Sequence, residues 1–373
     1  MKNFKNIKVV GEEESFVSDV KFDKIFSSLK KNDDEGSNYS GKIMLPGFFD
    51  VHSHGAIHLD FSTVQSEEEV KTLLNFYKSK GVTSLFPTLL TEHDELIFKQ
   101  LELLYKVSLS EPIIKGVHLE GPFISPEYKG AQLEECIQKP SIEKCKEFIK
   151  HSHGLFKYMT IAPERENSEE VIRFLTSNGI RVAMGHSAAT FDDTARGVQA
   201  GATSITHCLN AMKGIHQHTP SIASAALYFD SLYTEVILDG IHVNKEMVEW
   251  IRKIKGNDKV IGITDSLMAA GLPDGEYKIG NTPIIVKDHD CKIKETGVRA
   301  GSTLTMDVAF KHIKEFSNLD DVTASHITSL NAARMTGLDN KIGSIKEGKN
   351  ADFIIMDSNY KIEETYINGE RVY

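Results

Sequence analysis

The sequence lacks paired cysteines, long apolar runs and an excess of basic charge. Its four cysteines, Cys136, Cys145, Cys208 and Cys291, are scattered along 373 residues and form no C-x-x-C pair. This spacing argues against a disulfide framework or a thiolate zinc site, and it predicts reduced, structural thiols in a cytoplasmic protein. No run approaches the 18 apolar residues that a membrane span requires. The opening segment MKNFKNIKVVGEEESF has no apolar core that would predict a signal peptide.

The net charge is −10, and no basic stripe runs along the chain. We therefore expect neither a nucleic acid nor a membrane as partner, although a local site can still bind a small anion. Apolar residues make up 40% of the chain and charged residues 26%, as in a globular protein that buries a sizeable core. We find no internal repeat and no low-complexity tract.

From residue 46 onward, short apolar runs alternate with amphipathic stretches. The alternation predicts strands followed by helices, and therefore a parallel α/β fold. The strand-like segments include residues 81–90, 113–121, 156–164, 180–189, 234–243 and 259–267.

Polar residues follow these apolar strand segments. In a (β/α)₈ barrel the carboxyl ends of all strands open onto one face, where the active site lies. A doubly wound sheet gathers its site at one switch point and does not bring six strand ends together. We therefore predict a (β/α)₈ TIM barrel. The polar residues concerned are His52, His54, His118, Glu120, His186, His207, Asp239, His242 and Asp265.

The two ends of the chain lack the strand–helix alternation of the middle. Residues 1–45 and 345–373 contain short strand-like runs with polar turns, and we expect them to pair into a small β-sandwich. Residues 46–344 form the predicted barrel, with a β-hairpin insertion near residues 276–296. The length suits one large barrel with such an appendage.

The segment PGFFDVHSHG carries the first candidate metal ligands. Residues two apart in an extended strand point to the same face, so His52 and His54 can both contact one metal ion. Two surface histidines are the alternative interpretation. Their position after an apolar strand favours the metal.

Glu120 in GVHLEGPF, His186 in MGHSAAT and His207 in ITHCLNAM each follow an apolar strand. Alone, each has a structural alternative, a salt bridge for the glutamate and a hydrogen-bonded core position for the histidines. Together they form a Glu/His₂ set, which suits a catalytic divalent metal with an open position for water.

Asp265 in VIGITDSLMAAG is the candidate acid/base. A carboxylate beside a metal-bound water accepts its proton and returns it to the leaving group. A helix N-cap is the alternative role. The chemistry indicated is metal-assisted hydrolysis of an amide or a related bond. The ligand types suit zinc, iron, manganese or cobalt, with one or two ions per subunit.

The ordered motifs PGFFDVHSHG, HLEGPF, KGA, GHSAAT, THCLNAM, LDGIHV, ITDSLMAAG and AGSTLTM resemble those of N-acetylglucosamine-6-phosphate deacetylases in the amidohydrolase superfamily. The resemblance covers roughly residues 43–357. It implies a (β/α)₈ barrel with a small β-sandwich, a homodimer, and release of acetate from an amino-sugar 6-phosphate. The small-molecule partner implied is thus an amino-sugar phosphate.

The resemblance also implies roles for individual residues. Glu120, His186 and His207 match the ligands of the principal metal. His52 and His54 match a second metal site of some members, with Glu120 bridging, and Asp265 matches the catalytic acid/base. The substrate contacts implied are Asn210, Ala211 and His242, the last near the sugar phosphate.

Two departures from the family pattern fall on substrate-binding positions. Gln132 follows K-G-A where members commonly have a histidine. His218 stands where members commonly have an arginine that reaches the phosphate, in some across the dimer interface. A histidine binds phosphate singly, and as a cation only when it is protonated. Lys213 or Lys129 are candidates to compensate, and we expect His216 and His218 to lie near the anionic end of the substrate.

The sequence therefore predicts hydrolysis of N-acetylglucosamine 6-phosphate to glucosamine 6-phosphate and acetate. Three alternatives remain: an isomer such as N-acetylgalactosamine 6-phosphate, a different small amide, or a non-enzymatic protein built on the barrel.

Overall fold

Eight parallel strands form the central sheet of the computed structural model, which describes residues 1–280 and 282–373. Their order across the sheet follows their order in the chain. Two residues after β15, the Asp265 backbone N–H donates to the carbonyl of His52 in β6 at 2.9 Å, which links the last strand to the first. The sheet is therefore a nearly closed barrel, as predicted. Its strands are β6 (Phe48–Ser53), β9 (Val82–Leu89), β10 (Val117–Glu120), β11 (Phe156–Ile161), β12 (Arg181–Met184), β13 (Ser204–Ile205), β14 (Tyr233–Ile237) and β15 (Val260–Ile263).

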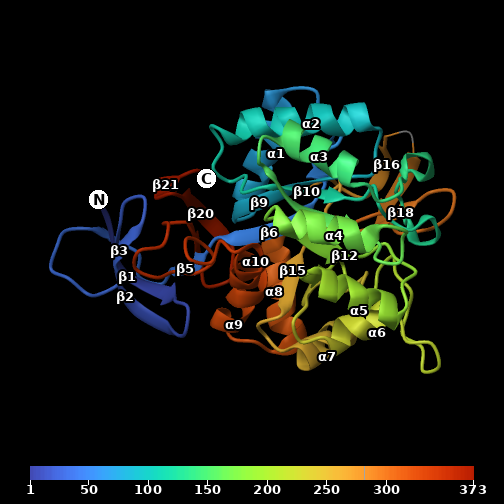
Figure 1. The fold of residues 1–373 in the computed structure, drawn as a ribbon. Coiled ribbons are helices and arrows are strands. Elements are labelled where there is room, and N and C mark those ends of the chain that lie inside the picture. The colour runs from blue at the N-terminus through green and yellow to red at the C-terminus, as the bar shows by residue number, and fades with distance from the viewer. Residues whose placement is uncertain (281) are drawn as a thin grey trace.

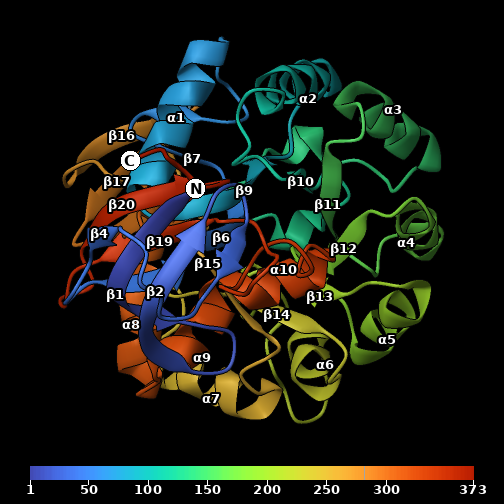
Figure 2. The same cartoon turned by 90° about the vertical axis from the view of Figure 1, so that its left-hand side faces the viewer.

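A helix follows each barrel strand, and the helices surround the barrel in a ring (Figure 2). Helices α1 (Glu67–Ser79) and α5 (Phe191–Ala200) begin at residues whose side chains cap the N-terminus. The Ser66 side chain accepts from the backbone N–H of Glu69, and Thr190 and Asp193 form a capping box. Among the described residues, no helix has the length and apolar character that crossing a membrane requires. The ring consists of α1 (Glu67–Ser79), α2 (Asp94–Ser108), α3 (Ile142–Ser152), α4 (Ser168–Ser177), α5 (Phe191–Ala200), α6 (Ile222–Tyr228), α7 (Lys245–Lys255) and α8 (Met306–Ser317).

A separate, mainly antiparallel sheet joins the two ends of the chain and lies beside the barrel (Figure 1). It curls on itself, because the rings of Phe22 and Phe353 meet with centroids 5.0 Å apart although three strand pairings separate their strands. The sheet thus encloses an apolar core of its own. Its strands are β1 (Lys2–Val10), β2 (Ser15–Phe22), β3 (Phe26–Ser28), β4 (Ser37–Asn38), β5 (Ile43–Pro46), β19 (Phe353–Met356), β20 (Ile362–Ile367) and β21 (Glu370–Arg371).

The insertion predicted as a hairpin near residues 276–296 has a third strand. An antiparallel sheet of β16 (Gly275–Ile279), β17 (Thr282–Lys287) and β18 (Asp290–Ile293) packs over a small apolar cluster that includes Leu267 and Cys291. It lies at the end of the barrel opposite the terminal sheet (Figure 1). The predicted position of the insertion is therefore confirmed, but a hairpin has one strand too few, and the division of the chain into two domains remains a prediction.

Shorter elements complete the fold. Strands β7 (Gly55–Ala56) and β8 (Leu59–Asp60) pair after β6, and α9 (Asp321–Ser325) continues through residues 326–330 into α10 (Asn331–Thr336). All four cysteines are buried and free, and burial raises the pKa of the Cys208 thiol to about 12. These thiols have the structural character that their spacing predicts.

Candidate active site

Six predicted side chains converge at the carboxyl ends of five barrel strands, and one of them, His54, directly follows β6. His52 lies in β6 and Glu120 ends β10, whereas His186, His207 and Asp265 come two residues after β12, β13 and β15. These last three residues adopt the left-handed backbone conformation, with φ of 46°, 26° and 49°. Such backbone strain is concentrated at functional sites, and here it lies where each strand end turns.

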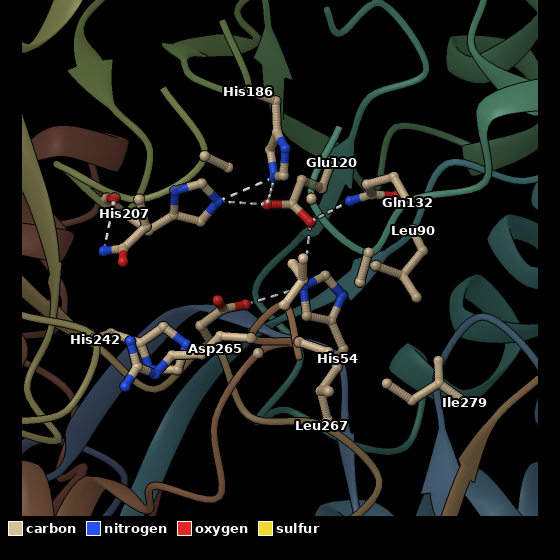
Figure 3. Close-up of a pocket in the computed structure, with 18 of the residues that line it drawn as sticks. His54, Leu90, Glu120, Gln132, His186, His207, His242, Asp265, Leu267 and Ile279 are labelled. Atoms are coloured by element: carbon tan, nitrogen blue, oxygen red, sulfur yellow. Dashed lines mark hydrogen bonds and ion pairs between the residues drawn. The ribbon is translucent and has the colours of Figure 1, made fainter. Parts of the chain in front are cut away.

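Glu120, His186 and His207 form the first group of candidate ligands (Figure 3). Oε1 of Glu120 lies 3.1 Å from Nε2 of His186 and 3.0 Å from Nε2 of His207. The two imidazole nitrogens are themselves 3.1 Å apart. Three ligand atoms thus surround one point, in the Glu/His₂ combination predicted from the sequence.

His52, His54 and Asp265 form a second group beside the first. Oδ1 of Asp265 lies 3.4 Å from Nε2 of His52 and 3.2 Å from Nε2 of His54. Glu120 lies between the groups, with Oε1 3.1 Å from His52 and Oε2 3.3 Å from His54. The glutamate therefore contacts ligands of both groups.

Hydrogen bonds at Nδ1 of His52 and His186 leave the Nε2 atom of each imidazole available to bind a cation. His186 donates from Nδ1 to the Tyr128 carbonyl at 2.8 Å, and His52 donates from Nδ1 to Oε2 of Glu235 at 3.1 Å. Each Nε2 then carries a lone pair that faces Glu120. Nε2 of His52 is buried and has no hydrogen-bond partner among the described residues. The side chains fit a divalent metal, which would supply the missing partner when bound.

The charge balance of the cluster also favours a cation. Burial raises the pKa of Glu120, but the neighbouring His52 and His186 outweigh it and hold that pKa well below its ordinary value. Burial lowers the pKa of His54, but Asp265 and Glu120 raise it to about 9. The carboxylates thus require positive charge beside them, which a divalent cation provides when it is bound.

Glu235 is a buried member of the site that the sequence analysis missed. Its Oε1 accepts from the Tyr158 hydroxyl at 2.5 Å, and its Oε2 accepts from His52 and from the backbone N–H of His207 at 3.3 Å. The carboxylate thereby orients one histidine of each ligand group. The available signal was a charged residue within the apolar strand segment TEVIL.

His118, although it belongs to β10, has a structural role in the barrel interior. It hydrogen-bonds to the hydroxyls of Thr160 at 2.8 Å and Thr88 at 3.3 Å. Burial and the nearby His52 hold its pKa well below the ordinary value, so its ring is neutral. Its ring packs edge-on against His52, with centroids 4.6 Å apart.

A cavity of about 350 Å³ opens above the ligand cluster. Four of the five predicted substrate contacts line it, namely Gln132, Asn210, Ala211 and His242, whereas His218 does not. His242 donates from Nδ1 to Asp239 at 2.6 Å, so its orientation is fixed. Gln132 donates to Oε2 of Glu120 at 2.5 Å and accepts from the Thr91 N–H at 2.7 Å. Its amide therefore orients the glutamate from the cavity wall.

His216 and His218 lie on an exposed loop outside this cavity. Nδ1 of His216 accepts from the backbone N–H of His218 at 3.2 Å. Neither residue lines the cavity within this chain, and neither does Lys129 or Lys213. Two cationic side chains do line it: Lys292, in β18 within the predicted insertion, and Arg299, in the segment that follows β18.

A parallel barrel with a Glu/His ligand cluster and a carboxylate at its mouth defines a metal-dependent hydrolase. The chain belongs to the amidohydrolase family, whose model matches residues 43–372. Its similarity to characterised members extends over most of its length.

The chain is 34% identical over 333 residues to N-acetylglucosamine-6-phosphate deacetylase of Bacillus subtilis, covering 88% of this chain and 84% of the relative. It is 31% identical over 333 residues to N-acetylgalactosamine-6-phosphate deacetylase of Escherichia coli O157:H7, covering 88% and 87%. A Mycobacterium smegmatis N-acetyl-D-glucosamine-6-phosphate deacetylase mutant, solved in complex with N-acetyl-D-glucosamine-6-phosphate, superposes with a TM-score of 0.93. That match has 27% identity and covers 100% of this chain and 99% of the other.

Proposed function

We propose that this protein hydrolyses the N-acetyl group of N-acetylglucosamine 6-phosphate to give glucosamine 6-phosphate and acetate. The observation that carries the proposal is the buried cluster of Glu120, His186, His207 and Asp265 at the base of the cavity. The relatives named above act on the same class of substrate.

Glu120, His186 and His207 would hold the principal metal, and His52 and His54 a second ion with Glu120 between them. Zinc, iron, manganese and cobalt all suit these ligands. When bound, such a cation polarises the amide carbonyl and lowers the pKa of water. One or two ions per subunit are consistent with this ligand set.

Asp265 performs the proton transfers in the proposed reaction. Burial raises its pKa, but His52 and His54 outweigh burial and lower it, so the carboxylate is ionised at neutral pH. It accepts the proton of the attacking water and delivers it to the amide nitrogen as the carbon–nitrogen bond breaks. Gln132 holds Glu120 in place while His242 lines the cavity for the sugar phosphate.

The galactosamine isomer is the second candidate substrate. It differs from the glucosamine compound at one ring hydroxyl, and the E. coli relative that acts on it is nearly as similar as the glucosamine enzymes. The metal-ligand cluster and Asp265 serve both isomers equally, so the choice depends on contacts to the sugar ring.

We also propose that the protein is a cytoplasmic homodimer. Met247, Trp250 and Ile254 are exposed on one side of α7 and form an apolar stripe suited to a second copy of the chain. The free thiols support the reducing location. Sedimentation tests the dimer, with Trp250→Glu as the variant expected to give a monomer and Lys253→Glu as the control. An unchanged dimer in Trp250→Glu would exclude this surface.

A substrate panel tests the proposed reaction. The metal-loaded protein is expected to release acetate from N-acetylglucosamine 6-phosphate much faster than from the unphosphorylated sugar, because the cavity presents cationic groups to a phosphate. N-acetylgalactosamine 6-phosphate is assayed in parallel. Equal rates with and without the phosphate, or no acetate from any compound, would contradict the proposal.

A further inference from the structure

The cavity above the ligand cluster has a cationic wall. Its carboxylates, Glu120 and Asp265, both belong to the metal-ligand groups. Outside the metal-ligand groups, the described lining residues able to carry charge are His242, Lys292 and Arg299, and the charge that each can carry is positive. An anionic substrate group is therefore attracted to the part of the cavity away from the carboxylates.

Arg299 and Lys292 are held together by Asp290. Arg299 donates from Nε and Nη2 to the two carboxylate oxygens at 2.9 and 3.2 Å, and Nζ of Lys292 lies 2.7 Å from Oδ2. Burial raises the pKa of Asp290, but these two cations outweigh it and lower that pKa. The three side chains therefore carry a net charge of about +1, and three of the five guanidinium N–H groups remain for an anion.

The backbone fixes Arg299 close to the reaction centre. The Ser302 N–H donates to the Asp265 carbonyl at 2.8 Å, and the intervening Gly301 has a φ of 51°. A Cβ on Gly301 would lie 2.5 Å from Cγ of Leu267 and 2.9 Å from the Asp265 oxygen. Only glycine permits this close approach. Three residues span at most about 10 Å, so the Arg299 backbone stays within that distance of Ser302.

The loop at residues 213–220 offers no comparable group within this chain. His218 is exposed and lies outside the cavity. A guanidinium is charged at any physiological pH and binds phosphate through two parallel hydrogen bonds, whereas an imidazole does neither. Arg299 has the chemistry that phosphate recognition requires, and it lines the cavity.

We propose that Arg299, assisted by Lys292, binds the phosphate of the substrate and sets the preference for phosphorylated sugars. The inference rests on the proposed function, since it assigns a residue to the same cavity. It assigns phosphate recognition to β18 and the segment that follows it in the same subunit, instead of to residues 216–221.

The test is calorimetric binding of N-acetylglucosamine 6-phosphate to the metal-loaded Asp265→Asn protein, in which turnover is blocked. Arg299→Gln in this background is expected to raise Kd about tenfold or more, because a charged hydrogen-bonding partner is lost. Lys292→Met is expected to raise it less. Lys294→Met is the matched control, because Lys294 pairs with Glu276 and does not line the cavity.

Two further measurements distinguish phosphate binding by Arg299 from a loss of stability and from phosphate binding by a histidine. Thermal unfolding of Arg299→Gln should match that of its parent. The loss of affinity caused by Arg299→Gln should be about the same at pH 6 and pH 8, because a guanidinium stays charged across the range in which a histidine and the phosphate titrate. Parent-like affinity in Arg299→Gln would overturn the inference, and a loss in His218→Ala instead would assign the phosphate to the loop. If the parent protein binds the phosphorylated sugar no better than the unphosphorylated one, the proposed function itself fails.

Discussion

Replacing Glu235 with glutamine is expected to weaken metal binding without unfolding the barrel. The carboxylate is fully buried and accepts hydrogen bonds from Tyr158, His52 and the backbone of His207. Glutamine has the same shape but no charge, and one end of its amide can only donate. The His52 imidazole would then lose the anionic acceptor that orients it and raises its basicity.

The magnitude follows from the position of Glu235 behind the ligands. Changes to groups that orient metal-binding histidines typically reduce metal affinity by about 10–100-fold, or roughly 1.4–2.7 kcal/mol. We expect the upper half of this range, because one carboxylate contacts histidines of both ligand groups. The ion held by His52 and His54 should be lost first.

The assay is the metal content per subunit after equilibration with a competing chelator of known affinity. Glu246→Gln on the exposed side of α7 is the matched control and should retain wild-type affinity. Tyr158→Phe removes one donor to Glu235 but keeps its charge, so its effect should be smaller. Wild-type metal affinity in a folded Glu235→Gln protein would refute the reasoning.

Three further predictions concern other parts of the molecule. Burial lowers the pKa of Lys255 to about 8, so the unfolded chain binds more protons between about pH 8 and 10.4 and stability should rise with pH in that window. Between pH 7 and 10, the free energy of unfolding measured with urea should rise by roughly 1–2 kcal/mol more for the wild type than for Lys255→Met, after allowance for partial solvent screening. The same pH dependence in both proteins would contradict this prediction. Gln132→Leu leaves the Thr91 N–H unpaired and releases Glu120, so kcat should fall about tenfold or more with metal still bound; unchanged turnover would remove Gln132 from its role. Phe22→Ala leaves a cavity in the core of the terminal sheet and should lower the free energy of unfolding by about 3–5 kcal/mol. Because the active site lies at the other end of the barrel, kcat should stay constant. A loss of kcat in the folded variant would contradict this independence of the two ends.

The metal-ligand cluster was predictable from sequence because its members share one position in the pattern. His52, Glu120, His207 and Asp265 each lie in or shortly after an apolar strand, and a parallel barrel brings all strand ends to one face. The barrel topology therefore places residues that share a position at the ends of strands in the sequence side by side in space. His118 obeyed the same pattern but points into the barrel interior, where it bonds to threonine hydroxyls.

The parts that the sequence did not reveal depend on packing between distant segments. Glu235 lies inside a strand, and its role emerges only when His52 is placed 183 residues away in sequence and 3.1 Å away in space. Arg299 lies just beyond the hairpin predicted near residues 276–296, and its contact with the cavity depends on how the segment after β18 packs at the barrel mouth. The local pattern marks Glu235 only as a charged residue within an apolar strand, and it does not show which distant residues either side chain contacts.

The most direct test of the whole account is acetate release from N-acetylglucosamine 6-phosphate by wild type and Asp265→Asn, each with its metal content measured in the same preparation. We predict rapid acetate release by the metal-loaded wild type, none after the metal is removed, and none from Asp265→Asn with its metal retained. Acetate release that survives either metal removal or the Asp265→Asn substitution would contradict the account.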